Sequence, residues 1–204
     1  MNARVKQREA TQASILQAAL KAFSEEGFEG ASTREIAAMA GVHHGLIKYH
    51  FKSKDLLWRA AVTFLFERQA QELALPDPAD PQYADPRVYA RAMIRERARY
   101  WARHPEHARL MAQESCRDSE RSRWMVEEYN RRAAKVGERF VRYLQDHDLA
   151  PANASVPSLV YIIMGASQLF FTLSPEVQRI WGVDPTDPKA VEDHIATLTE
   201  FLIR

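Results

Sequence analysis

Apolar residues recur at helical spacing along most of the 204-residue chain, and this period limits the folds that the chain can adopt. In residues 8–26, 119–147 and 188–203 they lie three and four positions apart, which places them on one face of a helix. No two segments show the apolar–polar alternation of paired, half-buried strands. The sequence therefore predicts an all-α protein.

Glycine and proline divide this pattern into separate helices. Gly27 follows the first helix, where a left-handed residue ends a helix at little cost. A capping box from Ser32 to Glu35 predicts the start of a short helix that ends at Gly41. Residues 76–86 contain four prolines, which cannot continue a helix. This segment predicts either a boundary between an N-terminal and a C-terminal part or a long loop inside one domain.

Composition narrows the class of protein. The net charge is +1, and a single cysteine, Cys116, excludes a disulfide framework and a cysteine-rich zinc site. We expect Cys116 to be a buried apolar residue. The N-terminal residues show no signal peptide and no apolar run reaches 18 residues, so we expect a cytoplasmic protein without a membrane span. The motifs of catalytic, cofactor-binding and metal sites do not occur, so we expect no enzyme, cofactor or metal.

Residues 33–52, which read TREIAAMAGVHHGLIKYHFK, fit a helix-turn-helix. The first helix offers small and apolar residues to the second, and Gly41 suits the tight turn between them. In the second helix Leu46 or Ile47, together with Phe51, supplies the inner face. The opposite face is then left free for DNA.

The residues around this segment resemble the DNA-binding domain of TetR-family transcriptional regulators over about residues 10–60. The matching motifs are Gly27-Phe28, Thr33-Arg34-Glu35-Ile36-Ala37, Gly41-Val42, Gly45 to Phe51, and Lys52-Ser53-Lys54-Asp55-Leu56-Leu57. The resemblance implies an N-terminal three-helix DNA-binding domain, expected at residues 1–55. It also implies a larger helical regulatory and dimerisation domain at 56–204, with a helix at about 54–75 linking the two.

Eight residues of this stretch are expected to contact DNA. Thr33 opens a helix whose free amides favour a phosphate, and Arg34 beside it is expected to reach a phosphate or a groove edge. The second helix is expected to enter the major groove, where His43, His44 and Lys48 would read bases. The family positions that hold the DNA backbone are matched by Tyr49, His50 and Lys54.

Other interpretations of these residues remain open. His50 could pack under the helix as a structural residue, and His43 and His44 could be solvent-exposed without touching DNA. Members of the family often carry an aromatic residue in place of Lys48, so the DNA sequence that this chain recognises cannot be taken from relatives. Residues 1–60 contain nine Lys or Arg and six Asp or Glu, a net charge of +3. Phosphate contacts by these cations would make binding salt-dependent.

The C-terminal part is rich in large apolar side chains, and the simplest interpretation is an ordinary core. The resemblance implies a pocket for a small apolar or aromatic effector, with expected lining residues Trp101, Met111, Met125, Tyr129 and Gln168. Residues 156–173 are apolar on nearly every side, which predicts that this helix faces both its own core and a second subunit. The residues expected at the homodimer interface are Leu159, Ile163, Phe170, Val191, Ile195, Leu198 and Leu202.

Together these features predict a ligand-responsive transcriptional repressor that a small effector releases from a palindromic operator in double-stranded DNA. Two other classes remain. One is a sequence-tolerant DNA-binding protein without an effector, against which the small positive charge argues. The other is a helical enzyme or carrier that has kept the helix-turn-helix as a scaffold, against which the missing catalytic motifs argue.

Overall fold

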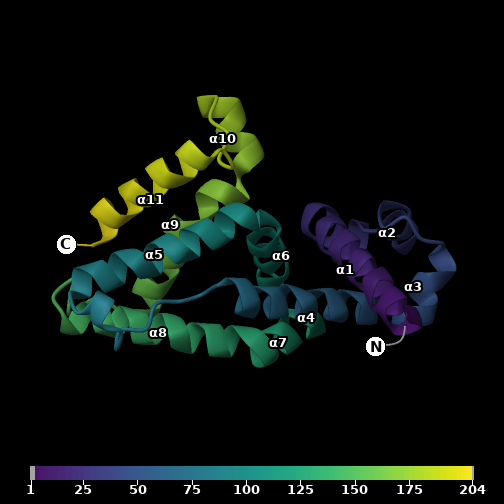
Figure 1. Ribbon diagram of the computed structural model, residues 1–204, viewed down its shortest axis with the longest axis horizontal. Coiled ribbons are helices and arrows are strands. Elements are labelled where there is room, and N and C mark those ends of the chain that lie inside the picture. The colour runs from purple at the N-terminus through teal and green to yellow at the C-terminus, as the bar shows by residue number, and fades with distance from the viewer. Residues whose placement is uncertain (1–2, 204) are drawn as a thin grey trace. The chain divides into compact units, whose positions relative to one another are not determined.

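The computed structural model describes residues 3–203, and every regular element in that range is helical, which confirms the predicted all-α fold (Figure 1). The α-helices are α1 (Ala3–Gly30), α2 (Thr33–Met39), α3 (His44–Phe51), α4 (Lys54–Glu72), α5 (Pro86–Arg103), α6 (Pro105–Ser115), α7 (Glu120–Met125), α8 (Arg131–Asp146), α9 (Val156–Thr172), α10 (Ser174–Trp181) and α11 (Pro188–Leu202). A 3-10 turn occupies Pro81–Tyr83, and a π-helical turn occupies Val126–Asn130.

The helices form two compact units that do not follow the order of the chain. The N-terminal unit comprises the residues up to 69 together with 109–125, and the C-terminal unit comprises 70–108 and the residues from 126 onward. The proline-rich segment 76–86 is therefore a connection inside the C-terminal unit. The domain division at residues 55 and 56 stays a prediction, and it did not anticipate that residues 109–125 belong with the first helices.

The N-terminal unit is built on the apolar stripe of α1. Leu20 and Phe23, which the spacing placed on the inner face, are 2% and 1% exposed, and Trp58 of α4 is as deeply buried. Gly27 has the expected positive φ of 72°, but the helix continues past this kink to Gly30. A glycine here is therefore a bend inside α1 and not its end.

The turn between α2 and α3 has a defined hydrogen-bond pattern. The Gly41 amide donates to the Ala38 carbonyl at 3.1 Å, and the Val42 amide donates to the Ala37 carbonyl at 3.0 Å. With Gly41 at φ 67°, this is the Schellman ending of a helix. The turn is thus fixed by its own backbone and by one residue in the left-handed region.

At the start of α2 the capping differs from the prediction. The Ser32 hydroxyl accepts a hydrogen bond from the amide of Arg34 at 3.2 Å, and not from the amide of Glu35. A hydroxyl at this position can reach either amide, and both arrangements satisfy one of the free donors of the first turn. The predicted helix start is correct, but the predicted reciprocal box is not the bond that forms.

The C-terminal unit packs around α5, which lies against α9 and α11. Phe171 of α9 is fully buried, and Ile195 and Leu198 of α11 are only 5% and 6% exposed in the same core. These two side chains are occupied inside their own chain, so Ile195 and Leu198 are core residues, and the rest of the predicted dimer interface stays a prediction. The other predicted interface residues are all half-buried. Those that pack against this core are Ile163, Phe170, Val191 and Leu202.

Two further predictions need correction. The run at 119–147 was predicted as one helix, whereas the structure inserts the π-helical turn between α7 and α8, where the chain crosses from one unit to the other. Cys116 is exposed and not buried, because it follows the last residue of α6 in the connection to α7. The sequence pattern also did not identify α10.

Within residues 3–203, no single helix is long and apolar enough to cross a membrane. The helices α9 and α10 reach the required length and apolarity only as a pair, and the chain bends by 69° between them.

Substitution of Gly41 tests the turn between α2 and α3. A Cβ at this position would meet no atom within 4 Å, so the cost of Gly41→Ala is backbone strain alone. We expect Gly41→Ala to lower the free energy of unfolding by about 1–2 kcal/mol. Gly41→Asn should lose less, because asparagine tolerates the left-handed region. Urea unfolding measures both, and an alanine variant as stable as the wild type would contradict the turn.

Candidate nucleic-acid interface

The start of α3 is organised by two histidine side chains. The His43 ring caps the helix, with its Nδ1 accepting a hydrogen bond from the Gly45 amide at 3.2 Å. The Nε2 of His44 lies 3.1 Å from the Oγ1 of Thr33, at the start of α2. The predicted residues Thr33, His43 and His44 are thus brought together, and each has a structural partner in addition to its proposed role.

The two faces of α3 differ in solvent exposure, as expected for a helix that binds in a DNA groove. Ile47 and Phe51 are buried, at 3% and 8% exposure, whereas Lys48 and Tyr49 are exposed. Tyr49 leaves 69% of its surface in solvent, which is unusual for a tyrosine. Because residues four apart share a helix face, His44 and Lys48 project from the same side of α3. The structure therefore presents an exposed polar and aromatic surface on an anchored helix.

His50 lies at the edge of this surface in a half-buried position. Its Nδ1 is buried without a hydrogen-bond partner among the described residues, and its ring lies edge-on to Tyr49 at 5.0 Å between centroids. Burial, and next the nearby Arg8, lower the pKa of His50 below its usual value. A neutral imidazole favours the structural interpretation of His50 over a cationic phosphate contact.

Lys54 joins two helices of the N-terminal unit. Its Nζ donates a hydrogen bond to the Glu29 carbonyl at 3.2 Å and lies 4.7 Å from the centroid of the Phe28 ring. This tie connects the start of α4 to the end of α1. Any phosphate contact by Lys54 would have to share the ammonium group with these partners.

Sequence reasoning missed the residues that complete this unit from α6 and α7. The Arg121 guanidinium lies 3.6 Å from the centroid of Phe28 and pairs with Glu114 at 3.4 Å. The Gln113 side chain donates to the Ser24 carbonyl at 2.9 Å. The contacts of Gln113 with Ser24 and of Arg121 with Phe28 join positions about 90 residues apart in sequence, and no local pattern signals them.

The predicted effector-lining residues are divided between the two units. Met111 and Met125 belong to the N-terminal unit, whereas Trp101, Tyr129 and Gln168 belong to the C-terminal unit. Trp101 and Met125 are buried and the other three are half-buried. A common pocket for these five residues therefore stays a prediction.

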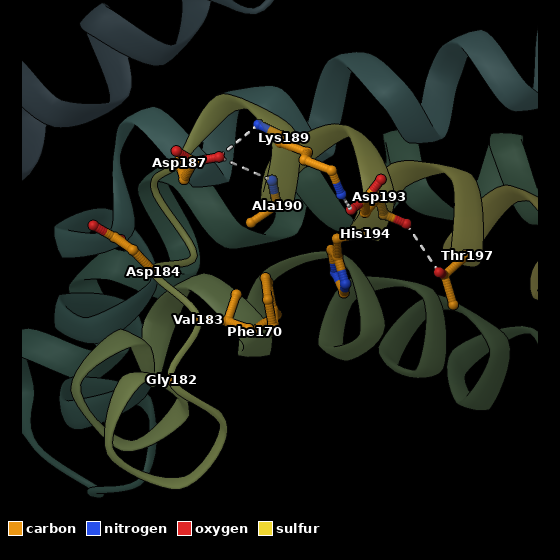
Figure 2. A pocket seen from close by; sticks show the side chains of 10 residues that line it. All are labelled: Phe170, Gly182, Val183, Asp184, Asp187, Lys189, Ala190, Asp193, His194 and Thr197. Carbon is orange, nitrogen blue, oxygen red and sulfur yellow. Dashed lines mark hydrogen bonds and ion pairs between the residues drawn. The ribbon is translucent and has the colours of Figure 1, made fainter.

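An open cavity of about 590 Å3 lies elsewhere, where the α10–α11 connection and α11 meet Phe170 of α9. Figure 2 shows that polar groups around the cavity bond to one another. The Asp187 carboxylate accepts hydrogen bonds from the first amides of α11, and Lys189 pairs with Asp193 at 2.6 Å. His194 lies 3.2 Å from the Ala166 carbonyl and stacks on Phe170, and burial lowers its pKa. None of the predicted effector-lining residues lines this cavity.

Among residues 3–203, no group of three or more His, Cys, Asp or Glu side chains has the geometry to hold a metal ion. The histidines at the start of α3 are engaged with Gly45 and Thr33 instead.

Comparison with known proteins identifies the class. Residues 15–61 match the family model described as bacterial regulatory proteins, tetR family. NicS, an HTH-type transcriptional repressor of Pseudomonas putida, is 32% identical over 114 residues, which cover 55% of this chain and 51% of NicS. RutR, an HTH-type transcriptional regulator of Escherichia coli, is 26% identical over 193 residues, which cover 93% of this chain and 87% of RutR. The chain thus spans about half the length of NicS and most of RutR.

Solved structures show the same fold. FadR from Bacillus halodurans, a fatty acid degradation regulator, superposes with a TM-score of 0.66 at 16% sequence identity, over 93% of this chain and 94% of FadR. The helix-turn-helix with its exposed α3 surface, followed by a larger helical part, defines a helical DNA-binding protein. Residues 15–61 therefore match the DNA-binding domain of the tetR family of bacterial regulatory proteins. The matching relatives NicS and RutR are transcriptional regulators, which are not enzymes.

The environment of His50 predicts a pH dependence of stability. Its pKa is lowered in the folded chain, so the unfolded chain takes up the proton first as the pH falls below about 6.5. We expect the wild type to lose more stability between pH 7.5 and 5.5 than His50→Gln, which cannot titrate. His194 contributes equally to both proteins. Urea unfolding at both pH values measures the difference, and equal losses would contradict the assigned environment.

Proposed function

We propose that this protein is a transcriptional repressor that binds a palindromic DNA operator as a homodimer and responds to a small-molecule effector. The observation that carries the proposal is the exposed surface of α3, with His44, Lys48 and Tyr49, on a helix anchored by Ile47 and Phe51. This is the arrangement of a recognition helix that lies in the major groove. The family and the regulator names of NicS and RutR support the proposal.

Two kinds of DNA contact are proposed. Lys48 and His44, on the outward side of α3, read base edges in the major groove. Thr33, Arg34 and Tyr49 contact phosphates and fix the position of α3 on the duplex. His43 and Lys54 support these residues through the cap of α3 and the tie to α1.

The homodimer is proposed to form through α9, α10 and α11. Most of the large apolar side chains that are exposed in the described chain belong to these helices and their connections. They are Tyr161, Ile162, Met164, Leu169, Leu173, Ile180, Trp181, Val183 and Phe201. Trp181 and Phe201 are 74% and 82% exposed, a large cost unless a second copy covers them. A twofold pairing would present two recognition helices to two half-sites.

The route from effector to DNA is proposed to run through residues 109–125. The helix α6 begins in the C-terminal unit and ends in the N-terminal unit, where Gln113 and Arg121 contact α1. A ligand that changes the C-terminal unit therefore acts on a segment that is part of the DNA-binding unit. The effector would shift the population toward a spacing of recognition helices that does not fit the operator.

An unbiased selection of bound DNA, sequenced at moderate salt, tests the proposal. A palindrome with two half-sites about one helical turn apart is the expected result. An enriched single half-site would contradict the dimer. The absence of any enriched sequence would favour the second function, a sequence-tolerant DNA-binding protein.

Substitution of Lys48 separates base reading from phosphate contact. We expect Lys48→Ala to weaken binding to the selected operator by about 1–3 kcal/mol and to leave binding to a scrambled duplex nearly unchanged. Lys21→Ala, on the exposed side of α1, is the matched control and should change neither affinity. Fluorescence anisotropy with both duplexes measures this, and an equal loss on both would assign Lys48 to a phosphate.

A charge on the exposed apolar surface tests the dimer. Leu169 on α9 is 54% exposed, and we expect Leu169→Glu to shift the protein from dimer to monomer at micromolar concentration. Val88→Glu introduces the same charge at a 44% exposed position on α5 and should leave the dimer intact. Sedimentation velocity distinguishes the species. A dimeric Leu169→Glu, or a monomeric wild type with specific DNA binding, would refute the proposed interface.

A further inference from the structure

Arg97 is a cation at the centre of the buried face of α5. Ala90, Met93, Ile94 and Trp101, which lie seven, four, three and four residues away, are all buried. In a helix these positions surround one another, so Arg97 extends from the side of α5 that faces the core of the C-terminal unit. An arginine is rarely found at such a position without a partner.

The Arg97 side chain has no such partner among the described residues. Its Nε is buried and makes no hydrogen bond, and no ion pair to a described carboxylate forms. Arg99, two residues along the same helix, shows the usual arrangement, because it pairs with Glu192 at 2.9 Å and with Glu96 at 3.5 Å. Among the described arginines of α5, Arg97 is the one whose Nε is buried without a hydrogen bond.

The surroundings of Arg97 locate this cation between α5 and α8. Helical side chains lean toward the N-terminus, which directs Arg97 along α5 toward Tyr89. The two groups interact electrostatically: Arg97 lowers the pKa of Tyr89 against the effect of burial, and Tyr89 opposes the lowering of the Arg97 pKa by burial. The Tyr89 ring contacts Tyr143 and Phe140 of α8, at 4.6 and 6.2 Å between centroids.

The helix α9 packs against both α5 and α8. The other charged groups that act on Tyr89 are Asp77 and Arg139, and neither has a comparable effect on Arg97. The site thus combines a half-buried arginine with a buried Nε, two tyrosines and apolar neighbours.

We propose that Arg97 binds the carboxylate of an organic monocarboxylate effector, whose apolar or aromatic body lies between α5 and α8. Arg97 is half-buried, and its partly desolvated charge has no carboxylate partner among the described residues. An anionic ligand that pairs with it offsets the cost of this desolvation. The planar guanidinium accepts a carboxylate through two parallel hydrogen bonds. A single buried positive charge matches one carboxylate better than a phosphate dianion. This inference rests on the proposed function, because it names the chemical class of its effector.

Paired probes with the same body and different charge test the site. Decanoate and 2-naphthoate are compared with their primary amides, and inorganic phosphate is added as a third anion, by thermal unfolding of the full chain. We expect at least one carboxylate, but neither amide nor phosphate, to raise the melting temperature of the wild type in a concentration-dependent way. No preference for either carboxylate over its amide, or a response to phosphate instead, would overturn the proposal.

Three variants assign the effect to Arg97. Arg97→Met should abolish the carboxylate response and, without ligand, should melt no lower than the wild type, because a partly desolvated, unpaired charge is removed. Arg91→Met, exposed on the same helix, should keep the full response. Arg97→Lys keeps the charge and should bind about tenfold more weakly, because it loses the two-pronged contact. A retained response in Arg97→Met, or an undiminished one in Arg97→Lys, would overturn the proposal.

A DNA-binding measurement keeps this test separate from the proposed function. The carboxylate that stabilises the wild type is added to its complex with the selected operator. Release of DNA supports both the site and the effector response. Stabilisation without release leaves the anion site standing and removes the effector response, whereas failure to select any operator removes the repressor function without changing the thermal result.

Discussion

Phe28, at the end of α1, lies against two cations from distant parts of the chain, and this contact joins α1, α4 and α7 in the N-terminal unit. Lys54 approaches the ring from the start of α4, and Arg121 approaches it from α7. Each cation–π contact contributes on the order of 1 kcal/mol. The pairing of Arg121 with Glu114 contributes more, because Glu114 is only 5% exposed and loss of its cation would leave a buried carboxylate unpaired, at a cost of about 3–5 kcal/mol.

This cluster explains why residues 109–125 belong to the unit that carries the helix-turn-helix. The segment is far from α1 in sequence, but Gln113 and Arg121 contact Ser24 and Phe28 of α1. A regulator needs a physical connection between its effector site and its DNA-binding surface. The proposed connection is α6, which begins in the C-terminal unit and whose Gln113 side chain contacts α1. The unpaired Arg97 provides a reason for the C-terminal unit to respond to an anion.

The sequence predicted the helices better than the surfaces against which each helix packs. Periodicity and glycine positions are local, so the helices, the turn at Gly41 and the buried Ile47 and Phe51 could be predicted from them. An apolar helix has more than one candidate face, and the period alone does not say which face meets its own core. The predicted interface residues Ile195 and Leu198 therefore proved to be core residues, and the exposed apolar surface lies on other side chains.

The candidate site shows the same limit. The exposed Lys48 and Tyr49 follow from the pattern of α3, but the contacts of His44 with Thr33 and of Lys54 with Glu29 depend on how neighbouring helices pack. Arg121 was not predicted at all, because its partner is more than 90 residues away. The effector residues were expected from the resemblance alone, whereas Arg97 becomes apparent only when burial and pairing are both known.

We propose that this chain recognises a DNA sequence and does not merely bind phosphates. The most direct measurement is the dissociation constant for the selected operator and for a scrambled duplex of equal length, over a series of salt concentrations. We expect the operator to bind at least about 1,000-fold more tightly than the scrambled duplex at each salt concentration. Both affinities should fall as the salt concentration rises. Equal affinities that fall together would contradict sequence recognition and leave only a general DNA-binding protein.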